Sequence, residues 1–241
     1  MTAHFAIPAT TFVLRAIIEA RLKVAYGTFA VPKVSIEPPP RPPAPNQGTA
    51  QPEPLVLTLF MHHASTNGAW RNMYDPHVDA RGSRFAKAPL VLDLHYLLAA
   101  HGSDLEREVL LGVAMSALHR NGVIPRLMIQ QLLSAIAIPA MPTKLMDTLT
   151  DEPLHDKGSQ PESITISQQA FDVDMSTKVW SALQSPMRPC AYYLVTTLFL
   201  DTGETFPDPG LVDSVVVAER PTVDPLAAVD EDIAVIGKAL P

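Results

Sequence analysis

Apolar positions between Pro89 and Arg120 follow two different periods, and these two segments organise the predicted fold. The first segment, residues 89–98, alternates in part and predicts a buried strand. The positions that would share one face of this strand are Leu90, Leu92, Leu94 and Tyr96. The second segment has helical spacing and begins at Ser103, which forms the pattern of a capping box with Glu106. A strand that feeds a helix in this way is a scaffold unit and holds no active site.

That helix is predicted to bury one apolar stripe and to end before a turn. The expected stripe consists of Leu105, Val109, Gly112, Val113, Ser116 and Ala117, with Leu110, Ala114 and Leu118 beside it. Asn121-Gly122 is typical of a helix end, and Pro125 prevents the helix from continuing.

The N-terminal segment predicts a second amphipathic helix over residues 9–26, capped by Thr10 or Thr11 and ended by Gly27. Its expected buried stripe consists of Val13, Ile17, Ala20 and Val24. A short alternating strand follows at residues 31–36.

Residues 37–54 form a proline-rich segment, in which eight of eighteen residues are proline. Proline fixes its own backbone and donates no hydrogen bond, so this segment is predicted to be an extended, exposed loop. A loop insertion between two strands is favoured over a ligand for a proline-recognising domain.

The remaining pattern predicts a mixed sheet with helices against it. Residues 55–61 are apolar on both faces and predict a central strand, which residues 62–87 connect to the strand at Pro89 as a long hairpin. Further elements are expected as a helix at 126–137, a strand at 164–166, a helix capped by Asp174 that ends near Leu183, and strands at 191–200 and 212–218. The fold class is therefore α+β: a single domain over residues 1–220 with a mixed, mostly antiparallel sheet, followed by an acidic tail at 221–241.

Composition narrows the function classes. The chain has 241 residues, of which 47% are hydrophobic and 18% charged, enough for a large core. A net charge of −7 without a basic cluster argues against nucleic acid as a partner. We expect no membrane span and no secretory signal, because the apolar runs are short. A single cysteine, Cys190, excludes an internal disulfide and fits a reducing compartment.

The sequence gives only weak indications of catalytic or metal-binding residues. His62, His63, Asp75, His77 and Asp79 fall in one expected loop, but their spacing matches no metal-ligand pattern, so we expect no metal.

Asp201-Thr202-Gly203 follows an apolar strand, as the catalytic tripeptide of aspartic proteases does, but Glu204 adds a second charge and a plain turn is favoured. Cys190 has no visible base. Phosphate-loop, dinucleotide, serine-elbow and zinc-protease motifs are absent from the sequence, so we expect no cofactor and no enzyme.

Four residues near a proline turn allow two interpretations. Trp180, Arg188, Tyr192 and Tyr193 are residue types that dominate protein interfaces, which predicts an anchor for a partner. Equally, Trp180 would cover a small core cluster while Arg188 pairs locally. The sequence leaves both interpretations open.

Several segments in order resemble one known family. They are the N-terminal helix, the strand from Leu55 to Phe60, the run Pro89-Leu90-Val91-Leu92-Asp93-Leu94-His95-Tyr96-Leu97-Leu98-Ala99-Ala100-His101-Gly102, the helix from Glu106 to Leu118, and the run Trp180-Ser181-Ala182-Leu183-Gln184-Ser185-Pro186-Met187-Arg188-Pro189-Cys190-Ala191-Tyr192. Together they resemble the cap, or tail-terminator, proteins of phage-tail-like contractile injection systems of the antifeeding-prophage type. Met187 and Cys190 depart from the family, which often has an aromatic residue before the arginine and a serine after Arg-Pro.

The resemblance implies a structural role. Such proteins form a ring of copies of themselves, usually sixfold, on the distal end of the inner tube and sheath, where they end polymerisation. The implied partners are the chain itself, the tube protein and the sheath protein, with assembly in the cytoplasm before release of an extracellular particle. The proline-rich segment and the acidic tail are the candidates for partner contacts. The alternatives are an adaptor that forms no ring and a dimeric protease built on Asp201.

Overall fold

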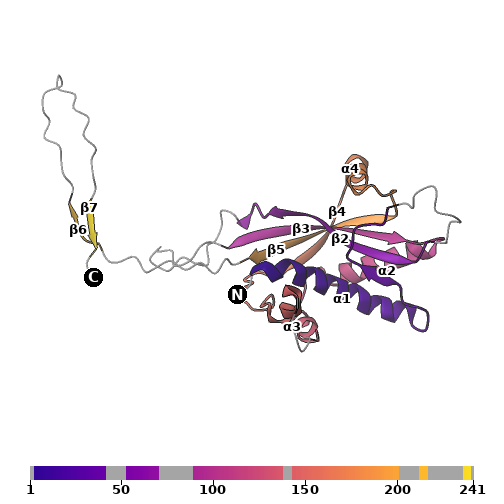
Figure 1. The fold of residues 1–241 in the computed structure, drawn as a ribbon, viewed down its shortest axis with the longest axis horizontal. Helices are drawn as coiled ribbons and strands as arrows, with labels where there is room; N and C mark the ends of the chain where they lie inside the picture. Colours follow the sequence, from indigo (N-terminus) through magenta and orange to yellow (C-terminus); the bar gives the residue numbers. More distant parts are fainter. Residues whose placement is uncertain are drawn as a thin grey trace, which may run out of the picture. The chain divides into compact units, whose positions relative to one another are not determined.

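The computed structural model of the protein describes residues 3–41, 53–70, 89–137, 143–200, 212–216 and 236–239. The chain divides into two units, one of residues 1–76 with 88–203 and the other of residues 77–87 with 204–241. The first unit holds a five-stranded sheet with helices on both faces (Figure 1), and the second holds a two-stranded sheet.

The five-stranded sheet has the order β1-β2-β3-β5-β4. Its strands are β1 (Lys33–Ser35), β2 (Val56–Thr66), β3 (Leu90–His101), β4 (Thr165–Gln169) and β5 (Cys190–Leu200). β1 runs parallel to β2, and every other neighbouring pair is antiparallel. The predicted α+β class, with a mixed and mostly antiparallel sheet, is confirmed.

β3 is the middle strand, and it buries both of its faces. Leu92, Leu94, Tyr96 and Leu98 point into the main core, as their alternation predicts. Leu97 and Ala99 point to the opposite face and join a second, smaller cluster. Leu90, at the strand's first position, is 44% exposed because it lies at the end of the sheet rather than under a helix.

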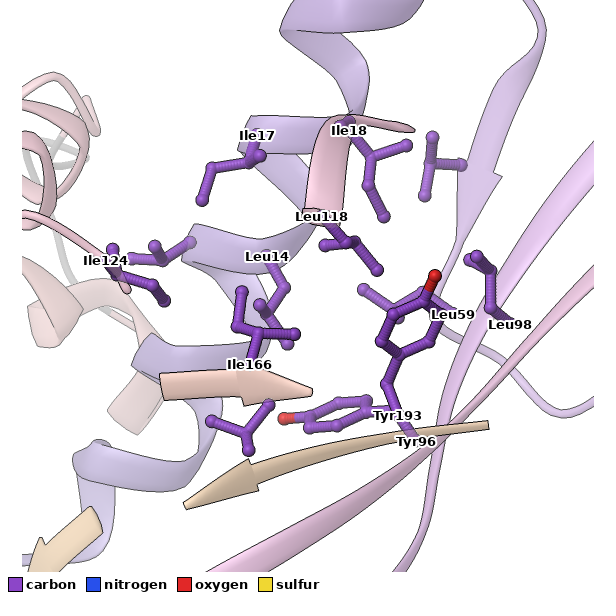
Figure 2. Packing of buried hydrophobic residues seen from close by; sticks show 14 of the residues in the cluster. Leu14, Ile17, Ile18, Leu59, Tyr96, Leu98, Leu118, Ile124, Ile166 and Tyr193 are labelled. Carbon is purple, nitrogen blue, oxygen red and sulfur yellow. The ribbon is translucent and has the colours of Figure 1, made fainter. Parts of the chain in front are cut away.

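Helices α1 (Ala6–Tyr26), α2 (Glu106–Arg120) and α3 (Arg126–Ser134) cover the main-core face. Figure 2 shows Leu14 and Ile18 of α1 beside Leu118 of α2, with Leu98 of the sheet to their right. The hydroxyls of Thr11 and Tyr96 lie 2.7 Å apart, which joins α1 to β3 through a hydrogen bond within this core. Because that bond partners its hydroxyl, Tyr96 can be fully buried, and burial raises the pKa of the phenol.

The predicted caps of the first two long helices are wrong. α1 begins at Ala6, so Thr10 lies within the helix, and its hydroxyl donates to the Ala6 carbonyl at 2.8 Å. α2 begins at Glu106 with Leu105 at the N-cap and no side-chain cap. The chain leaves β3 through a turn in which Asp104 has a left-handed backbone (φ 69°), and the Asp104 carboxylate accepts from the Leu105 N–H at 2.7 Å. This turn displaces Ser103 from the capping position.

The buried stripes are also shifted from the predicted ones. Leu105 and Val109 of α2 are 68% and 53% exposed, and Val24 of α1 is 70% exposed. Val13 and Ile17 of α1 and Ala117 of α2 are buried as predicted, but the faces that meet the sheet and the neighbouring helix extend to the side of the predicted stripes. Their buried members include Leu14, Ile18 and Leu22 of α1 and Leu110, Ala114, Ala117 and Leu118 of α2.

The C-terminal half of the first unit adds a 3-10 helix, η3 (Leu145–Asp151), and the helix α4 (Val173–Leu183). Asp172, rather than the expected Asp174, caps α4, because its carboxylate accepts from the Met175 N–H at 2.7 Å.

The second unit pairs β6 (Val212–Val216) with β7 (Ile236–Ala239) in an antiparallel sheet. β7 lies within the segment expected to be a tail, where the sequence analysis predicted no strand. The boundary at residue 220 stays a prediction.

Replacing Leu118 by Ala tests the main core. Leu118 is 1% exposed, so we expect the variant to lower the free energy of unfolding by about 2–5 kcal/mol through lost burial and a new cavity. The control is Leu127→Ala on α3, where the side chain is 63% exposed and the loss should stay within about 0.5 kcal/mol. Equal losses in urea unfolding would contradict the described packing of α2.

Candidate partner-contact site

α4 lies on the face of the sheet opposite α1 and α3 (Figure 1) and covers the second apolar cluster. We call this the α4 cluster; its buried members are Leu97, Ala99, Trp180 and Tyr192. The rings of Phe171 and Tyr192 stack with centroids 4.0 Å apart, and the hydroxyls of Ser176 and Tyr192 lie 2.9 Å apart. The cluster therefore fixes α4 to β3 and β5 by both apolar and polar contacts.

The turn after α4 is fixed by backbone geometry. Gln184 ends the helix with a left-handed backbone (φ 54°), which turns the chain toward Ser185. Pro186 and Pro189 then hold the turn extended until β5 begins. The Pro189 carbonyl accepts from the Ala100 N–H at 3.1 Å, so this turn is tied to the end of β3.

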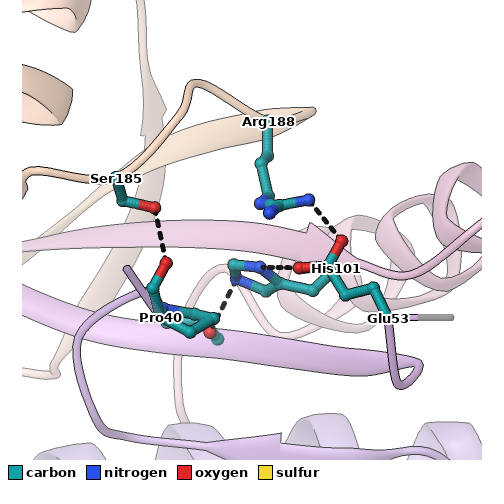
Figure 3. Close-up of polar contacts among 6 residues, drawn as sticks. Pro40, Glu53, His101, Ser185 and Arg188 are labelled. Carbon is teal, nitrogen blue, oxygen red and sulfur yellow. Dashed lines mark hydrogen bonds and ion pairs between the residues drawn. The ribbon is translucent and has the colours of Figure 1, made fainter. Parts of the chain in front are cut away.

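Two contacts join this turn to the two ends of the proline-rich segment (Figure 3). The Ser185 hydroxyl donates to the Pro40 carbonyl at 2.9 Å, on the N-terminal side of the segment. The Arg188 guanidinium forms an ion pair with the Glu53 carboxylate, on the C-terminal side. We call these four residues, together with His101 and Thr58, the arm base.

His101 completes the arm base from the last position of β3. Its Nε2 lies 3.0 Å from the Thr58 hydroxyl, and its Nδ1 lies 3.8 Å from a Glu53 carboxylate oxygen. Burial, followed by the nearby Arg188 cation, lowers the pKa of His101, while Glu53 acts in the opposite direction. The ring is therefore neutral near pH 7, and Glu53 is left to pair with Arg188.

Gly102 allows the segment to approach so closely. Its φ is 139°, and a Cβ at this position would lie 2.9 Å from Leu55 Cδ1. A side chain at this position would strain the backbone at its positive φ and crowd the Leu55 side chain, so the conformation favours glycine.

The structure separates the four predicted interface residues. Trp180 and Tyr192 come together in the α4 cluster, whereas Tyr193 points to the other face of β5 and joins the main core. Arg188 pairs with Glu53. Their role in binding a partner stays a prediction. Sequence reasoning missed Glu53, His101 and Ser185, since the pair Glu53–Arg188 spans 135 positions and leaves no local signal.

The remaining candidates from the sequence are the residues considered for metal binding and for protease activity. His62 and His63 lie in β2 rather than in a loop, while Asp75, His77, Asp79 and the Asp201-Thr202-Gly203 tripeptide lie outside the described residues. Within the ranges that the structure describes, no group of three or more acidic, histidine or cysteine side chains is placed to hold a metal ion.

Cys190 is half-buried, and burial raises the pKa of its thiol, which disfavours the nucleophilic thiolate. Over the same described ranges, no helix has the length and apolarity needed to cross a membrane.

A family model described as the Pvc16 N-terminal domain matches residues 9–214 of the chain. Among solved structures, the chain is similar to the sheath/tube terminator of PVC, an extracellular contractile injection system, in its extended state. The identity is 12%, with 90% of this chain and 64% of that chain covered and a TM-score of 0.44.

It is also similar to the tube-terminating cap of the anti-feeding prophage, with 15% identity, 86% and 59% coverage and a TM-score of 0.37. The chain thus spans less than two thirds of either structure's chain. The search of curated proteins gives no match.

The arm base predicts coupling between Glu53 and Arg188. We expect Glu53→Gln and Arg188→Gln each to cost about 1–2 kcal/mol of unfolding free energy, and the double variant to cost less than their sum. Lys178→Gln, which breaks the exposed pair with Asp174, is the control and should cost no more than about 0.5 kcal/mol. Strict additivity in the double-mutant cycle would show that the pair is not coupled.

The α4 cluster also predicts acid sensitivity through His62. The His62 ring meets the rings of Phe171 and Tyr192 edge-on, and burial, followed by His95 and His63, lowers its pKa from 6.5 to about 4. Between these two pH values the unfolded chain binds a proton that the folded chain does not, so stability falls as pH decreases through this window.

His62→Gln should therefore lose less melting temperature than the parent between pH 7 and pH 4. His119→Gln, an exposed histidine of α2, is the control and should follow the parent curve. Parallel curves for the parent and His62→Gln would contradict the assignment.

Proposed function

Since the chain belongs to the family described as the Pvc16 N-terminal domain, as the resemblance drawn from its sequence indicated, we propose that it is the structural cap of a contractile injection system. The match over residues 9–214 is the observation that carries this proposal. The proposed cap ends the growth of the inner tube and sheath and couples the two at their distal end.

The proposed role follows from how tubes grow. Tube and sheath subunits add head to tail, so a growing end always presents a surface that accepts another subunit. A cap matches that surface on one side and offers none on the other. We propose that copies of this chain form a sixfold ring on the inner tube, with the sheath protein as a second partner.

The arm base supports separate roles for the proline-rich segment and for the sheet with its helices. It holds residues 40 and 53, the flanks of the proline-rich segment, against one turn of the rigid first unit. A segment whose two ends are fixed can present a partner-binding stretch from a defined place on the ring. We propose that residues 37–54 and the acidic residues 221–241 contact the sheath, while the sheet and its helices form the ring.

The proposed role needs no catalysis. We propose a non-enzymatic protein that assembles inside the producing cell and leaves it as part of an extracellular particle. Trp180 and Tyr192 serve this role as internal supports of α4, because both side chains are buried within the chain.

The solution mass, alone and with short tube fragments, tests the proposal. We expect about six copies per particle, either in the free protein or on tube ends, because a cyclic ring closes head-to-tail contacts. Tube fragments whose ends are already capped provide the control and should recruit no protein. A monomer or dimer that ignores open tube ends would overturn the proposed function.

A further inference from the structure

The two edge strands of the five-stranded sheet, β1 and β4, differ in how well they are protected from pairing with another chain. The β1 edge is three residues long, carries Lys33, and is flanked by Pro32 and Pro38. Short length, lysine and proline are the devices that keep an edge strand from pairing with another chain. The β4 edge, in contrast, contains Ser167, Gln168 and Gln169 and has neither lysine nor proline.

Half of the β4 edge is already paired. The Ile124 N–H donates to the Ile164 carbonyl at 3.0 Å, and the Ile166 N–H donates to the Gly122 carbonyl at 2.7 Å. These bonds form an isolated antiparallel bridge between Val123 and Thr165, and the pairing stops at Gly122, where the chain comes from α2. Along a strand, the backbone groups of every second residue point to the same edge. The N–H and C=O of Gln168 therefore point to the same outer edge of β4 as the N–H of Ile166, beyond the part that Gly122 pairs.

A groove of about 670 Å³ lies beside this open half. It runs between the C-terminal part of α2 and β4, and its apolar lining includes Met115, Leu118 and Tyr193. His119 and Gln168 line it with polar groups. An added strand paired with Gln168 would direct every second side chain into this groove, so apolar residues at alternate positions would fit it.

The second unit contains a strand pair that needs such support. β6 and β7 form a sheet of two strands, and two strands alone are at best marginally stable in water. Within the described residues, β6 and β7 are the strands outside the five-stranded sheet, and their outer edges are unpaired. The sequence of β6 includes Val212, Val215 and Val216, and that of β7 begins with Ile236.

We propose that the β4 edge of one copy accepts the β6–β7 sheet of a neighbouring copy by strand addition. This inference rests on the proposed ring and names one of its subunit contacts. The donor gains a third strand and an apolar groove, and the acceptor pairs the backbone groups of Gln168. Because the donor and acceptor surfaces are different, the contact is head-to-tail and can close into a ring.

Disulfide trapping between two singly substituted full-length chains tests the contact. One chain carries Gln168→Cys, and a differently tagged chain carries either Val215→Cys or Lys238→Cys; both have Cys190→Ala to remove the native thiol. A bridge forms only when two Cα atoms come within about 7 Å, so mild oxidation of the assembled mixture reports this pairing directly. The control acceptor is Lys33→Cys, on the protected β1 edge. We expect about tenfold more linked pairs with Gln168→Cys than with Lys33→Cys.

Backbone substitution separates strand addition from a side-chain contact. Gln168→Pro removes the outward N–H without removing a bond to β5, so the monomer should keep its melting temperature while assembly falls about tenfold. Gln168→Ala keeps that N–H and should assemble within about twofold of the parent.

A ring without linkage at residue 168, or with equal assembly of the two variants, would overturn the proposal and leave the proposed function standing. A failure to form any ring would overturn both.

Discussion

The two-sided burial of β3 is the constraint on which the rest of this structure depends. A strand with apolar side chains on both faces needs cover on both faces, and the chain supplies α1 and α2 on one side and α4 on the other. Burying Tyr96 adds a second requirement, because a phenol in a core needs a partner, and Thr11 provides it. The positions of the N-terminal helix and of α4 follow from these demands.

The arm base fixes the position of the proline-rich segment and adds little to the stability of the fold. A partly buried ion pair returns little net free energy, since desolvation of both charges offsets their attraction. The pair contributes to geometry, because it holds Glu53 at Arg188, beside His101 and the Gly102 position that leaves room for Leu55. The same residues therefore determine where the proline-rich segment leaves and re-enters the sheet.

Sequence periodicity was sufficient to predict most elements and the identity of the central strand. It located β3 and its inward-facing positions because alternation reflects burial directly. It failed at helix starts, where the turn at Asp104 overrode a good capping pattern at Ser103. It also centred the apolar stripe of α2 to one side of the buried face, because a helix with apolar residues around much of its circumference allows its neighbours to determine which face is covered.

The arm base lay beyond sequence reasoning for a different reason: its residues share no spacing, and only the closed sheet brings Glu53 to Arg188. The family resemblance pointed to the segment that contains Arg188, yet a motif cannot name a partner so far away in the chain.

That separation has a consequence for how the protein is made. The proline-rich segment leaves the ribosome early, but its anchors at Ser185 and Arg188 are synthesised more than 130 residues later. Such contacts close large loops and form late in folding. A nascent or truncated chain therefore has a free proline-rich segment, and only a chain with a finished sheet holds it in place. The order of synthesis thus delays the anchoring of Pro40 and Glu53 until the strands and helices between them and their partners have been made.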